Sequence, residues 1–409
     1  MDSNTKYVIL VGDGMGDLPM AELGGRTPLE VANTPNMDRV AKGGIGLVKT
    51  IPPGMEPGSD VATMSLLGYD PTLYHTGRAP LEAASMNLRL RDGHVAFRMN
   101  LVTLGRLSDD EIIMESYNSG EISAEEGVLI VKDLARALER SGIKLFPGVA
   151  YRHILLWEQG PEEVFTVPPH DVLGQNVAPY LSDPGNHLIS QIIKASWPIL
   201  ENHPVNLDRR RKGLLEANSI WLWGQGPPPR MPSFQELFGL KGGVVSAVDL
   251  LKGIGRYGGL EAPDVKGATG YINTNYEGKV QAALEILKRA DFVLLHLEAP
   301  DEASHRGDTS DKIKAIEAFD QRIVGPVLQG LKEYEKYRVM VVSDHLTPIT
   351  KRTHTDDPTP FAWAWNHELE DTDSRGVDLG FSESAAKRTG LFFKIGHHLM
   401  PNFLVKSST

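Results

Sequence analysis

The stretch of sequence that decides the fold is Tyr7-Val8-Ile9-Leu10-Val11-Gly12-Asp13. Its five apolar residues follow one another without alternation, which is typical of a strand buried on both faces of a parallel sheet. In open α/β sheets, binding sites form at the carboxyl ends of the strands. The stretch therefore predicts a central strand with a functional carboxylate, Asp13, directly after it.

Two further apolar runs of this kind occur later in the chain, at Phe292–Leu297 and Val339–Val342. A helical apolar spacing precedes each of them, over Val280–Leu287 and Ile313–Leu331. Buried strands that alternate with amphipathic helices predict an α/β fold, in which helices cover a mostly parallel sheet.

The middle of the chain has a different pattern. Residues Met86–Leu90 alternate, Asp92-Gly93 is a hairpin signal, and Val95–Leu104 is strand-like. A helix is predicted over residues 125–141, and the proline-rich segment 224–229 predicts a loop. We therefore expect an inserted α+β domain over residues 86–239, within a discontinuous core of residues 1–85 and 240–409.

Composition narrows the class of protein. The 409 residues are 41% hydrophobic and 23% charged, which allows two or three ordinary globular domains. A net charge of -11 without a basic run argues against a nucleic-acid partner. The absence of cysteine excludes disulfides and thiolate chemistry. No apolar run reaches the roughly 18 residues of a membrane span, and no secretory signal precedes the first strand, so we expect a cytoplasmic protein.

Aspartate and histidine follow all three apolar runs. The candidate metal ligands are Asp13, Asp301, His305, Asp344, His345 and His354. A mixed carboxylate and imidazole set suits Mn²⁺ or Zn²⁺ better than Ca²⁺ or Mg²⁺. Each residue taken alone could instead cap a helix or satisfy a loop, but their convergence at strand ends favours a metal site. A dinucleotide fingerprint fits poorly, because Asp17 stands where the last glycine should be.

The candidate nucleophile is Ser59, in the segment Pro57-Gly58-Ser59-Asp60. The Pro-Gly pair bends the chain and the residues after it look helical, so Ser59 would lie at a helix N-terminus, where phosphate is stabilised. The competing interpretation is a plain N-cap serine. A serine hydroxyl needs activation, which a bound metal ion can supply.

Substrate-binding residues are less well defined by the sequence. The candidates are Arg78, Arg98, Arg152, His170, Asp171 and Lys252. A guanidinium group forks well onto phosphate or carboxylate, but each of these residues could equally be a solvated surface group. We interpret the basic run 209–212 as a solvated helix face.

The quoted motifs occur together in a characteristic order. Gly12-Asp13-Gly14, Pro57-Gly58-Ser59-Asp60, Asp301 with His305, Asp344-His345 and Thr353-His354 resemble those of the alkaline phosphatase superfamily. More closely, the chain resembles the archaeal-type cofactor-independent phosphoglycerate mutases over essentially its whole length, most loosely in the inserted domain. The resemblance implies a three-layer alkaline-phosphatase-like core with a substrate-binding cap, and Lys252 resembles a lysine of that family.

The resemblance also implies a site with two divalent ions, most readily Mn²⁺, with Zn²⁺ or Mg²⁺ as alternatives. Asp301, His305 and His354 would hold one ion, and Asp13, Ser59, Asp344 and His345 the other. Ser59 would carry the phosphoryl group between the two hydroxyls of a small metabolite, interconverting 3- and 2-phosphoglycerate, while the cap excludes water. A homo-oligomer is left open.

Three alternatives are kept. The family pattern implies arginines where this chain has Glu121 and Trp223, a departure that favours a phosphotransferase acting on another hydroxylated metabolite such as homoserine. A phosphomonoesterase would use water as acceptor, which a large inserted domain disfavours. A catalytically inactive binding protein would not need all seven ligands.

Overall fold

The structure is a computed structural model that describes residues 5–138, 142–370 and 380–404. The chain divides into two compact units, which we call the first unit (residues 1–75 and 230–409) and the second unit (residues 76–229). Both junctions lie ten residues before the expected boundaries, which is more than the usual error of about 2–4 residues for element ends. The cause is helix α5 (Arg78–Ser85), whose Ala79 and Ala83 pack on the sheet of the second unit. No helix in the described ranges is long and apolar enough to cross a membrane.

The first unit contains a seven-stranded sheet, and the predicted α/β class is confirmed. In sheet order its strands are β12 (Phe392–Phe393), β2 (Ile45–Val48), β11 (Thr359–Trp365), β10 (Lys336–Ser343), β1 (Thr5–Gly12), β9 (Phe292–Leu297) and β8 (Gly242–Val245). Strands β10, β1, β9 and β8 pair in parallel, and β11 runs antiparallel to both of its neighbours. The predicted central strand β1 therefore lies between the two other predicted strands.

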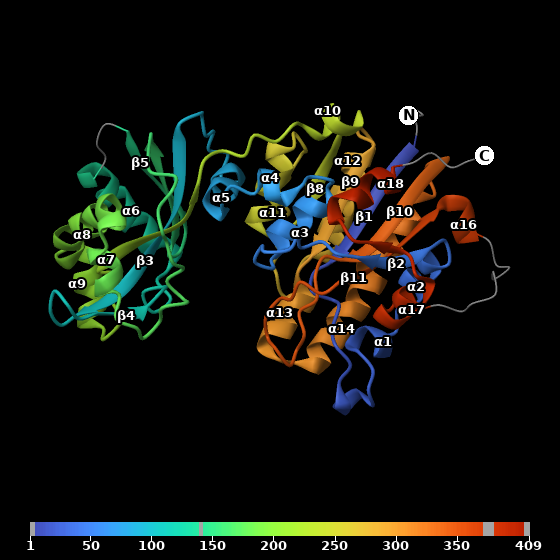
Figure 1. The fold of residues 1–409 in the computed structure, drawn as a ribbon, viewed down its shortest axis with the longest axis horizontal. Coiled ribbons are helices and arrows are strands. Elements are labelled where there is room, and N and C mark those ends of the chain that lie inside the picture. The colour runs from blue at the N-terminus through green and yellow to red at the C-terminus, as the bar shows by residue number, and fades with distance from the viewer. Residues whose placement is uncertain (1–4, 139–141, 371–379, 405–409) are drawn as a thin grey trace. The chain divides into compact units, whose positions relative to one another are not determined.

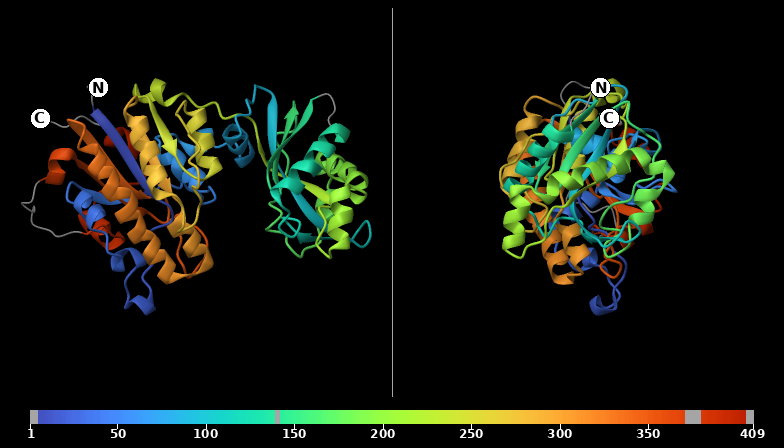
Figure 2. Two further views of the ribbon diagram at one scale, coloured as in Figure 1. Left: turned by 180° about the vertical axis from the view of Figure 1, so that it is seen from behind. Right: turned by 90° about the vertical axis from the view of Figure 1, so that its left-hand side faces the viewer.

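Helices cover both faces of this sheet. Val8 and Leu10 belong to a core with α12, α14 and α15, whereas Tyr7, on the opposite face, packs edge-on against Phe403 of α18. Figure 2 shows the long helices of the first face lying across the sheet (yellow to orange, left view). The side chains on both faces of β1 are thus buried, which explains why its apolar run is unbroken.

The helices of the first unit are mostly short. They are η1 (Ala21–Leu23), α1 (Pro28–Val31), α2 (Pro35–Ala41), α3 (Ser59–Leu66), α4 (Pro71–Tyr74), α10 (Phe234–Phe238), α11 (Asp249–Tyr257), α12 (Tyr276–Leu287), α13 (Ala299–Arg306), α14 (Thr309–Phe319), η3 (Asp320–Val324), α15 (Gly325–Leu331), α16 (Asn366–Glu370), α17 (Glu383–Thr389), η4 (Gly396–His398) and α18 (Leu399–Phe403). The helix predicted over 313–331 is present, but a π-helical turn, η3, interrupts it. Pro326, the second residue after that turn, cannot donate a backbone hydrogen bond.

The second unit has its own antiparallel sheet and its own core. Its strands run β4 (Ile112–Ser116), β3 (His94–Arg106), β6 (Arg152–Glu158) and β5 (Ile143–Val149), and β7 (Ser219–Gly226) also pairs with β3. Its helices are α5, α6 (Ala124–Leu138), α7 (Ala178–Ser182), η2 (Pro184–Asn186), α8 (His187–Glu201) and α9 (Pro204–Arg211). Phe97 and Met99 pack toward α6 and α8, while Ala96, on the other face, packs toward α5. Figure 1 shows α6, α7, α8 and α9 gathered on one side of this sheet.

Three local predictions were wrong. Residues 86–90 form no strand, because α5 ends at Ser85 and Asn87 adopts a positive φ of 59° in the turn that follows. Residues 224–226 continue β7 rather than start a loop. In the basic run, Arg209 is buried and paired with Glu126, and only its neighbours are exposed. The end of the helix predicted over 125–141 lies outside the described residues.

Candidate functional site

The site is built where three parallel strands of the first unit end. Gly12, the last residue of β1, pairs with Ser343 of β10 on one side and with Leu297 of β9 on the other. The residues that follow, Asp13 and Asp344, therefore emerge at the same edge of the sheet, and α13 begins there with Asp301 in its first turn. Adjacent parallel strands impose this convergence.

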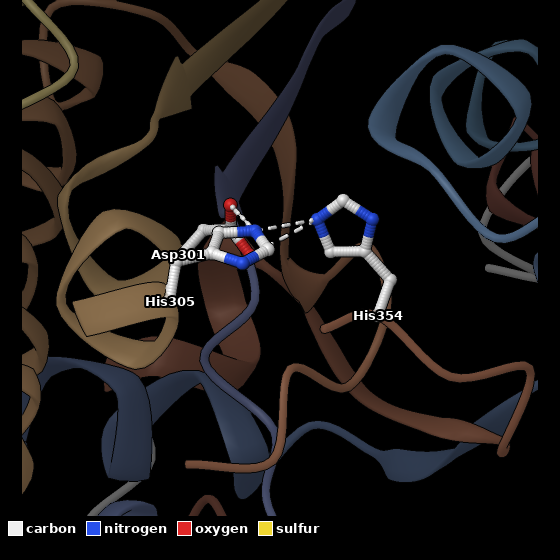
Figure 3. Close-up of side chains that lie close together, drawn as sticks. All are labelled: Asp301, His305 and His354. Carbon is white, nitrogen blue, oxygen red and sulfur yellow. Dashed lines mark hydrogen bonds and ion pairs between the residues drawn. The ribbon is translucent and has the colours of Figure 1, made fainter. Parts of the chain in front are cut away.

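Asp301, His305 and His354 form a first cluster, drawn in Figure 3. Asp301 Oδ2 lies 3.1 Å from His305 Nε2, and Asp301 Oδ1 lies 3.5 Å from His354 Nε2. The two Nε2 atoms are 3.0 Å apart. Two nitrogens that both lack a hydrogen would repel at this distance unless a proton or a cation lies between them.

The backbone orients both imidazoles of this cluster. His305 Nδ1 donates to the carbonyl of Arg352 at 2.9 Å, and His354 Nδ1 donates to the carbonyl of Pro57 at 3.2 Å. Each Nε2 is thereby turned toward Asp301. Metal-binding histidines are usually held in this way by their second ring nitrogen.

Asp13, Ser59, Asp344 and His345 form a second cluster beside the first. Ser59 Oγ lies 3.3 Å from both carboxylate oxygens of Asp13 and 3.1 Å from His345 Nε2. His345 Nε2 lies 3.4 Å from Asp13 Oδ1 and 3.4 Å from Asp344 Oδ2. Ser59 is the first residue of α3 and is half-buried, whereas the other three are buried. All seven predicted ligand positions thus fall in two adjoining clusters of the first unit.

Thr347 joins the two clusters, although the sequence analysis did not single it out. Its Oγ1 donates to Asp301 Oδ1 at 2.6 Å and therefore accepts from His345 Nδ1, 3.1 Å away. That assignment leaves His345 Nε2 unprotonated toward Ser59. Gly14 lies close against Thr347 and Asp301, where only a glycine fits. Its φ is +57°, and a Cβ there would lie 2.5 Å from Thr347 Oγ1 and 2.6 Å from Asp301 Oδ1.

The electrostatics of the site are dominated by crowded carboxylates. Burial, and then the charges of Asp344 and Asp301, raise the pKa of Asp13 well above its usual range. Burial also acts to raise the pKa of Asp301, but hydrogen bonds with His305 and His354 outweigh it and hold that pKa well below its usual range. The same hydrogen bond with Asp301 raises the pKa of His305 to about 9. Burial and like charge thus oppose ionisation of Asp13, whereas the two imidazoles favour ionisation of Asp301.

These residues fit a pair of divalent cations. Asp344 Oδ2 is buried and makes no hydrogen bond within the described part of the chain, which is rare for a carboxylate oxygen. Carboxylate and imidazole atoms are ligands that first-row divalent metals accept. A cation in each cluster would satisfy this oxygen and separate the facing nitrogens of His305 and His354.

His296, on β9, was also missed by the sequence analysis. It is fully buried, and its Nε2 lies 3.1 Å from Asp13 Oδ2. Burial lowers its pKa to about 3. The signal that could have found it is a histidine inside an otherwise apolar strand.

The loop after β1 is anchored by a buried lysine, Lys312 of α14. Its Nζ donates to Asp17 Oδ2 at 2.8 Å, to the carbonyl of Thr347 at 3.0 Å and to the carbonyl of Gly16 at 3.2 Å. The two loops that carry Asp13 and His345 are therefore tied to one ammonium group.

Five of the six predicted substrate-binding residues influence one another's pKa values within the second unit. Burial lowers the pKa of Arg98 against the opposing charge of Glu82, and the charges of Arg78 and Arg152 lower it further. Burial also lowers the pKa of His170; Asp171 opposes this, and Arg98 and Arg78 add to it. Groups whose pKa values are shifted by burial and by one another often cluster at functional sites.

Arg98 is itself held in place. Its Nη2 lies 3.0 Å from Glu82 Oε1, and its guanidinium lies 4.0 Å from the ring centroid of Trp223. Trp223 is buried and donates from Nε1 to Asn100 Oδ1 at 3.0 Å. The indole is therefore a support for Arg98, whereas Glu121 is exposed and has a positive φ of 57°.

Asp171 and Lys252 are placed differently. The Asp171 side chain is 58% exposed, and its Oδ1 lies 3.5 Å from His170 Nε2. Lys252 lies in the first unit, on α11, where its Nζ is 2.9 Å from both Asp249 and Asp264. An anionic ligand would have to compete with these two carboxylates.

Comparison with known proteins places the chain in a family. Residues 41–206 match the family described as 2,3-bisphosphoglycerate-independent phosphoglycerate mutase, and residues 225–371 match type I phosphodiesterase / nucleotide pyrophosphatase. A Geobacter sulfurreducens protein named probable 2,3-bisphosphoglycerate-independent phosphoglycerate mutase is 47% identical over 98% of this chain and 99% of its own. A Methanothrix thermoacetophila protein of the same name, without the qualifier, is 50% identical over 97% of this chain and 98% of its own.

Solved structures agree with these relatives. A Pyrococcus horikoshii protein is 31% identical, superposes with a TM-score of 0.80 and covers 99% of both chains. The cofactor-independent phosphoglycerate mutase of Thermoplasma acidophilum is 25% identical, with a TM-score of 0.65 over 98% of this chain and 99% of that one. The chain belongs to the family of 2,3-bisphosphoglycerate-independent phosphoglycerate mutases.

Proposed function

We propose that this protein interconverts 3-phosphoglycerate and 2-phosphoglycerate without bisphosphoglycerate, through a phosphoserine at Ser59. The observation that carries the proposal is the half-buried Ser59 hydroxyl, 3.1 Å from His345 and 3.3 Å from Asp13. Relatives that match nearly the whole chain carry the name of this activity. They do not favour a homoserine phosphotransferase.

Asp301, His305 and His354 would hold one divalent ion, and Asp13, Ser59, Asp344 and His345 the other, with Mn²⁺ as the expected metal. Bound ions lower the pKa of the serine hydroxyl and neutralise the charge on the phosphoryl oxygens. Helix α3 adds to this, because its first backbone N–H groups have no partner within the helix and point their positive dipole end toward Ser59.

The reaction is a double transfer at one serine. Ser59 Oγ gives up its proton and forms a bond to phosphorus while the bond to the first substrate oxygen breaks, and that oxygen takes up a proton. The second substrate hydroxyl then gives up its proton and attacks the phosphorus, the bond to Ser59 Oγ breaks, and Ser59 Oγ takes a proton back. The substrate must stay bound between the two steps, and water must stay out, or the phosphoserine would hydrolyse.

Positively charged side chains are the candidates for binding the anionic substrate. Arg78, Arg98 and Arg152 form a group whose charges repel one another, and we propose that this group, with His170 and Asp171, binds the phosphoglycerate. Lys252 is a further candidate, for which the anion would have to compete with Asp249 and Asp264. A cytoplasmic location is the matching expectation for an enzyme of a small phosphorylated metabolite.

The test is an assay of the metal-loaded protein with 3-phosphoglycerate and no bisphosphoglycerate. Formation of 2-phosphoglycerate, abolished by chelation and restored by Mn²⁺, would support the proposal. Release of inorganic phosphate faster than 2-phosphoglycerate would instead identify a phosphomonoesterase. No turnover in a protein shown to contain metal would reject both.

A further inference from the structure

The ring nitrogen Nε2 of His296 lies beside the second cluster, next to Asp13. It is 3.1 Å from Asp13 Oδ2, yet within the described ranges this nitrogen makes no hydrogen bond. The side chain is fully buried, so bulk water does not reach this nitrogen. Asp344 Oδ2, the other partnerless atom of the site, belongs to the same group.

Three donor atoms converge at this point. One atom each from Asp13, His296 and Asp344 lies within 4.8 Å of the others. Two buried atoms without a partner, one a carboxylate oxygen and one an imidazole nitrogen, are costly unless something binds both. A cation is the group that accepts lone pairs from both kinds of atom.

We propose that His296 is a ligand of the ion in the second cluster, bound through Nε2 beside Asp13 and Asp344. The inference rests on the proposed function, which places a metal ion there. Two atoms that each lie about 2.1 Å from one ion, in a tetrahedral or octahedral arrangement, are about 3.0 to 3.4 Å apart. The separation of 3.1 Å between His296 and Asp13 falls in this range, as do the 3.4 Å separations from His345 to Asp13 and Asp344.

The second ring nitrogen of His296 is held as a metal ligand requires. Its Nδ1 lies 3.3 Å from Ser246 Oγ, which also accepts from the backbone N–H of Val248 at 2.9 Å. Nδ1–H donating to Ser246 leaves the lone pair on Nε2. Metal-bound histidines nearly always fix their tautomer through such a contact.

A crystal structure of the Mn²⁺-loaded protein, with the ions located by anomalous scattering, tests the proposal. We expect His296 Nε2 about 2.1 Å from the ion that Asp13 and Asp344 bind. An ion held by Asp13, Asp344 and His345 with Nε2 beyond 3 Å would overturn the inference and leave the proposed function standing. Absence of any ion from that cluster would overturn both.

Pulsed electron paramagnetic resonance of bound Mn²⁺ gives a second readout, because it counts coordinated imidazole nitrogens in solution. We expect four over the two ions in the wild type and three in His296→Gln. His153→Gln is the matched control, since His153 is also a buried histidine but lies in the second unit. Three nitrogens in the wild type, unchanged in His296→Gln, would mean that His296 only positions Asp13. The wild-type count stands even if the variant fails to fold.

Discussion

The hydroxyl of Ser59 and the imidazole of His345 lie 3.1 Å apart, from Oγ to Nε2, although 286 positions separate them in the chain. They meet because β10 ends beside β1, so that His345 reaches the sheet edge at which α3 begins. Thr347 then holds the far side of the ring, through Nδ1. An alcohol facing an unprotonated imidazole nitrogen and a carboxylate is placed to bind a metal ion and to act as a nucleophile.

Replacing the nucleophile should stop the reaction. In Ser59→Ala we expect mutase activity to fall by about 10⁴-fold or more, because the covalent route is lost. Both clusters keep their carboxylates and imidazoles, so the protein should still bind two Mn²⁺ ions, measured by metal analysis after dialysis. Ser182→Ala, an exposed serine of the second unit, is the control and should keep full activity. Activity within tenfold of wild type in Ser59→Ala would contradict the assignment.

In the metal-free protein, the first cluster should make the free energy of unfolding depend on pH. The pKa of His305 is raised to about 9, and that of His354 moves in the same direction. Because the folded-state pKa exceeds the ordinary value of about 6.5, the stabilisation is complete below about pH 6.5 and is lost as the pH rises to about 9. Mn²⁺ competes with this proton, so its affinity should rise over the same range.

Urea unfolding at a series of pH values measures this effect. The free energy of unfolding of the metal-free wild type should decrease between pH 6.5 and 9. Asp301→Asn should flatten the profile, since Asp301 is the partner that raises both pKa values. Asp356→Asn, which removes an exposed carboxylate paired with Lys49, should leave the slope unchanged. A wild-type profile without a decrease would count against the arrangement.

Gly14 can be tested against a matched glycine. A methyl group at residue 14 would collide with Thr347 Oγ1 and Asp301 Oδ1, and its φ of +57° is also unfavourable for alanine. Gly24 has a φ of +67°, but nothing lies within 4 Å of the methyl group that alanine would add. Gly24→Ala should therefore cost only about 1–2 kcal/mol of stability and leave Mn²⁺ affinity intact. Gly14→Ala should lower Mn²⁺ affinity as well, and equal affinities in the two variants would refute this role.

Lys312 should be indispensable for stability. Lys312→Met leaves Asp17 buried without its ammonium partner, and we expect a loss of about 3–5 kcal/mol in urea unfolding. Lys314→Met removes an exposed lysine from the same helix and should change stability by less than about 0.5 kcal/mol. Comparable losses in the two variants would show that the buried pair has no special importance.

Arg98 should affect substrate binding. Arg98→Lys replaces the planar guanidinium, which can donate two parallel hydrogen bonds to a phosphate or carboxylate, and removes its contact with Trp223. We therefore expect KM for phosphoglycerate to rise by about tenfold to a hundredfold. Arg106→Lys is the control, since Arg106 lies over Trp197 in a similar contact on the same strand. Unchanged KM in Arg98→Lys, from steady-state kinetics, would remove Arg98 from the binding group.

Much of the first unit could be predicted from sequence because its physics is local. A run such as Tyr7–Val11 has no polar face, so it identifies a doubly covered strand wherever it occurs. The predicted ligands Asp13 and Asp344 follow such strands directly, and the parallel pairing brings them together.

The remaining features depend on tertiary contacts. Thr347 and Lys312 are recognisable only once the loops that they join lie side by side. A turn follows α5 where a strand was predicted, because α5 packs on a sheet whose strands all come later in the chain. Trp223 looked like a missing cation, whereas in the structure it supports Arg98, a contact that sequence spacing does not encode.

The proposed mechanism requires that a phosphoryl group passes through Ser59. Rapid quench of the Mn²⁺-loaded protein with 3-phosphoglycerate labelled in its phosphate, followed by peptide mapping, measures this directly. The proposed mechanism predicts label on the peptide that carries Ser59. This phosphoserine should form and disappear at least as fast as 2-phosphoglycerate appears. Full turnover with no label on Ser59 at any time would contradict it.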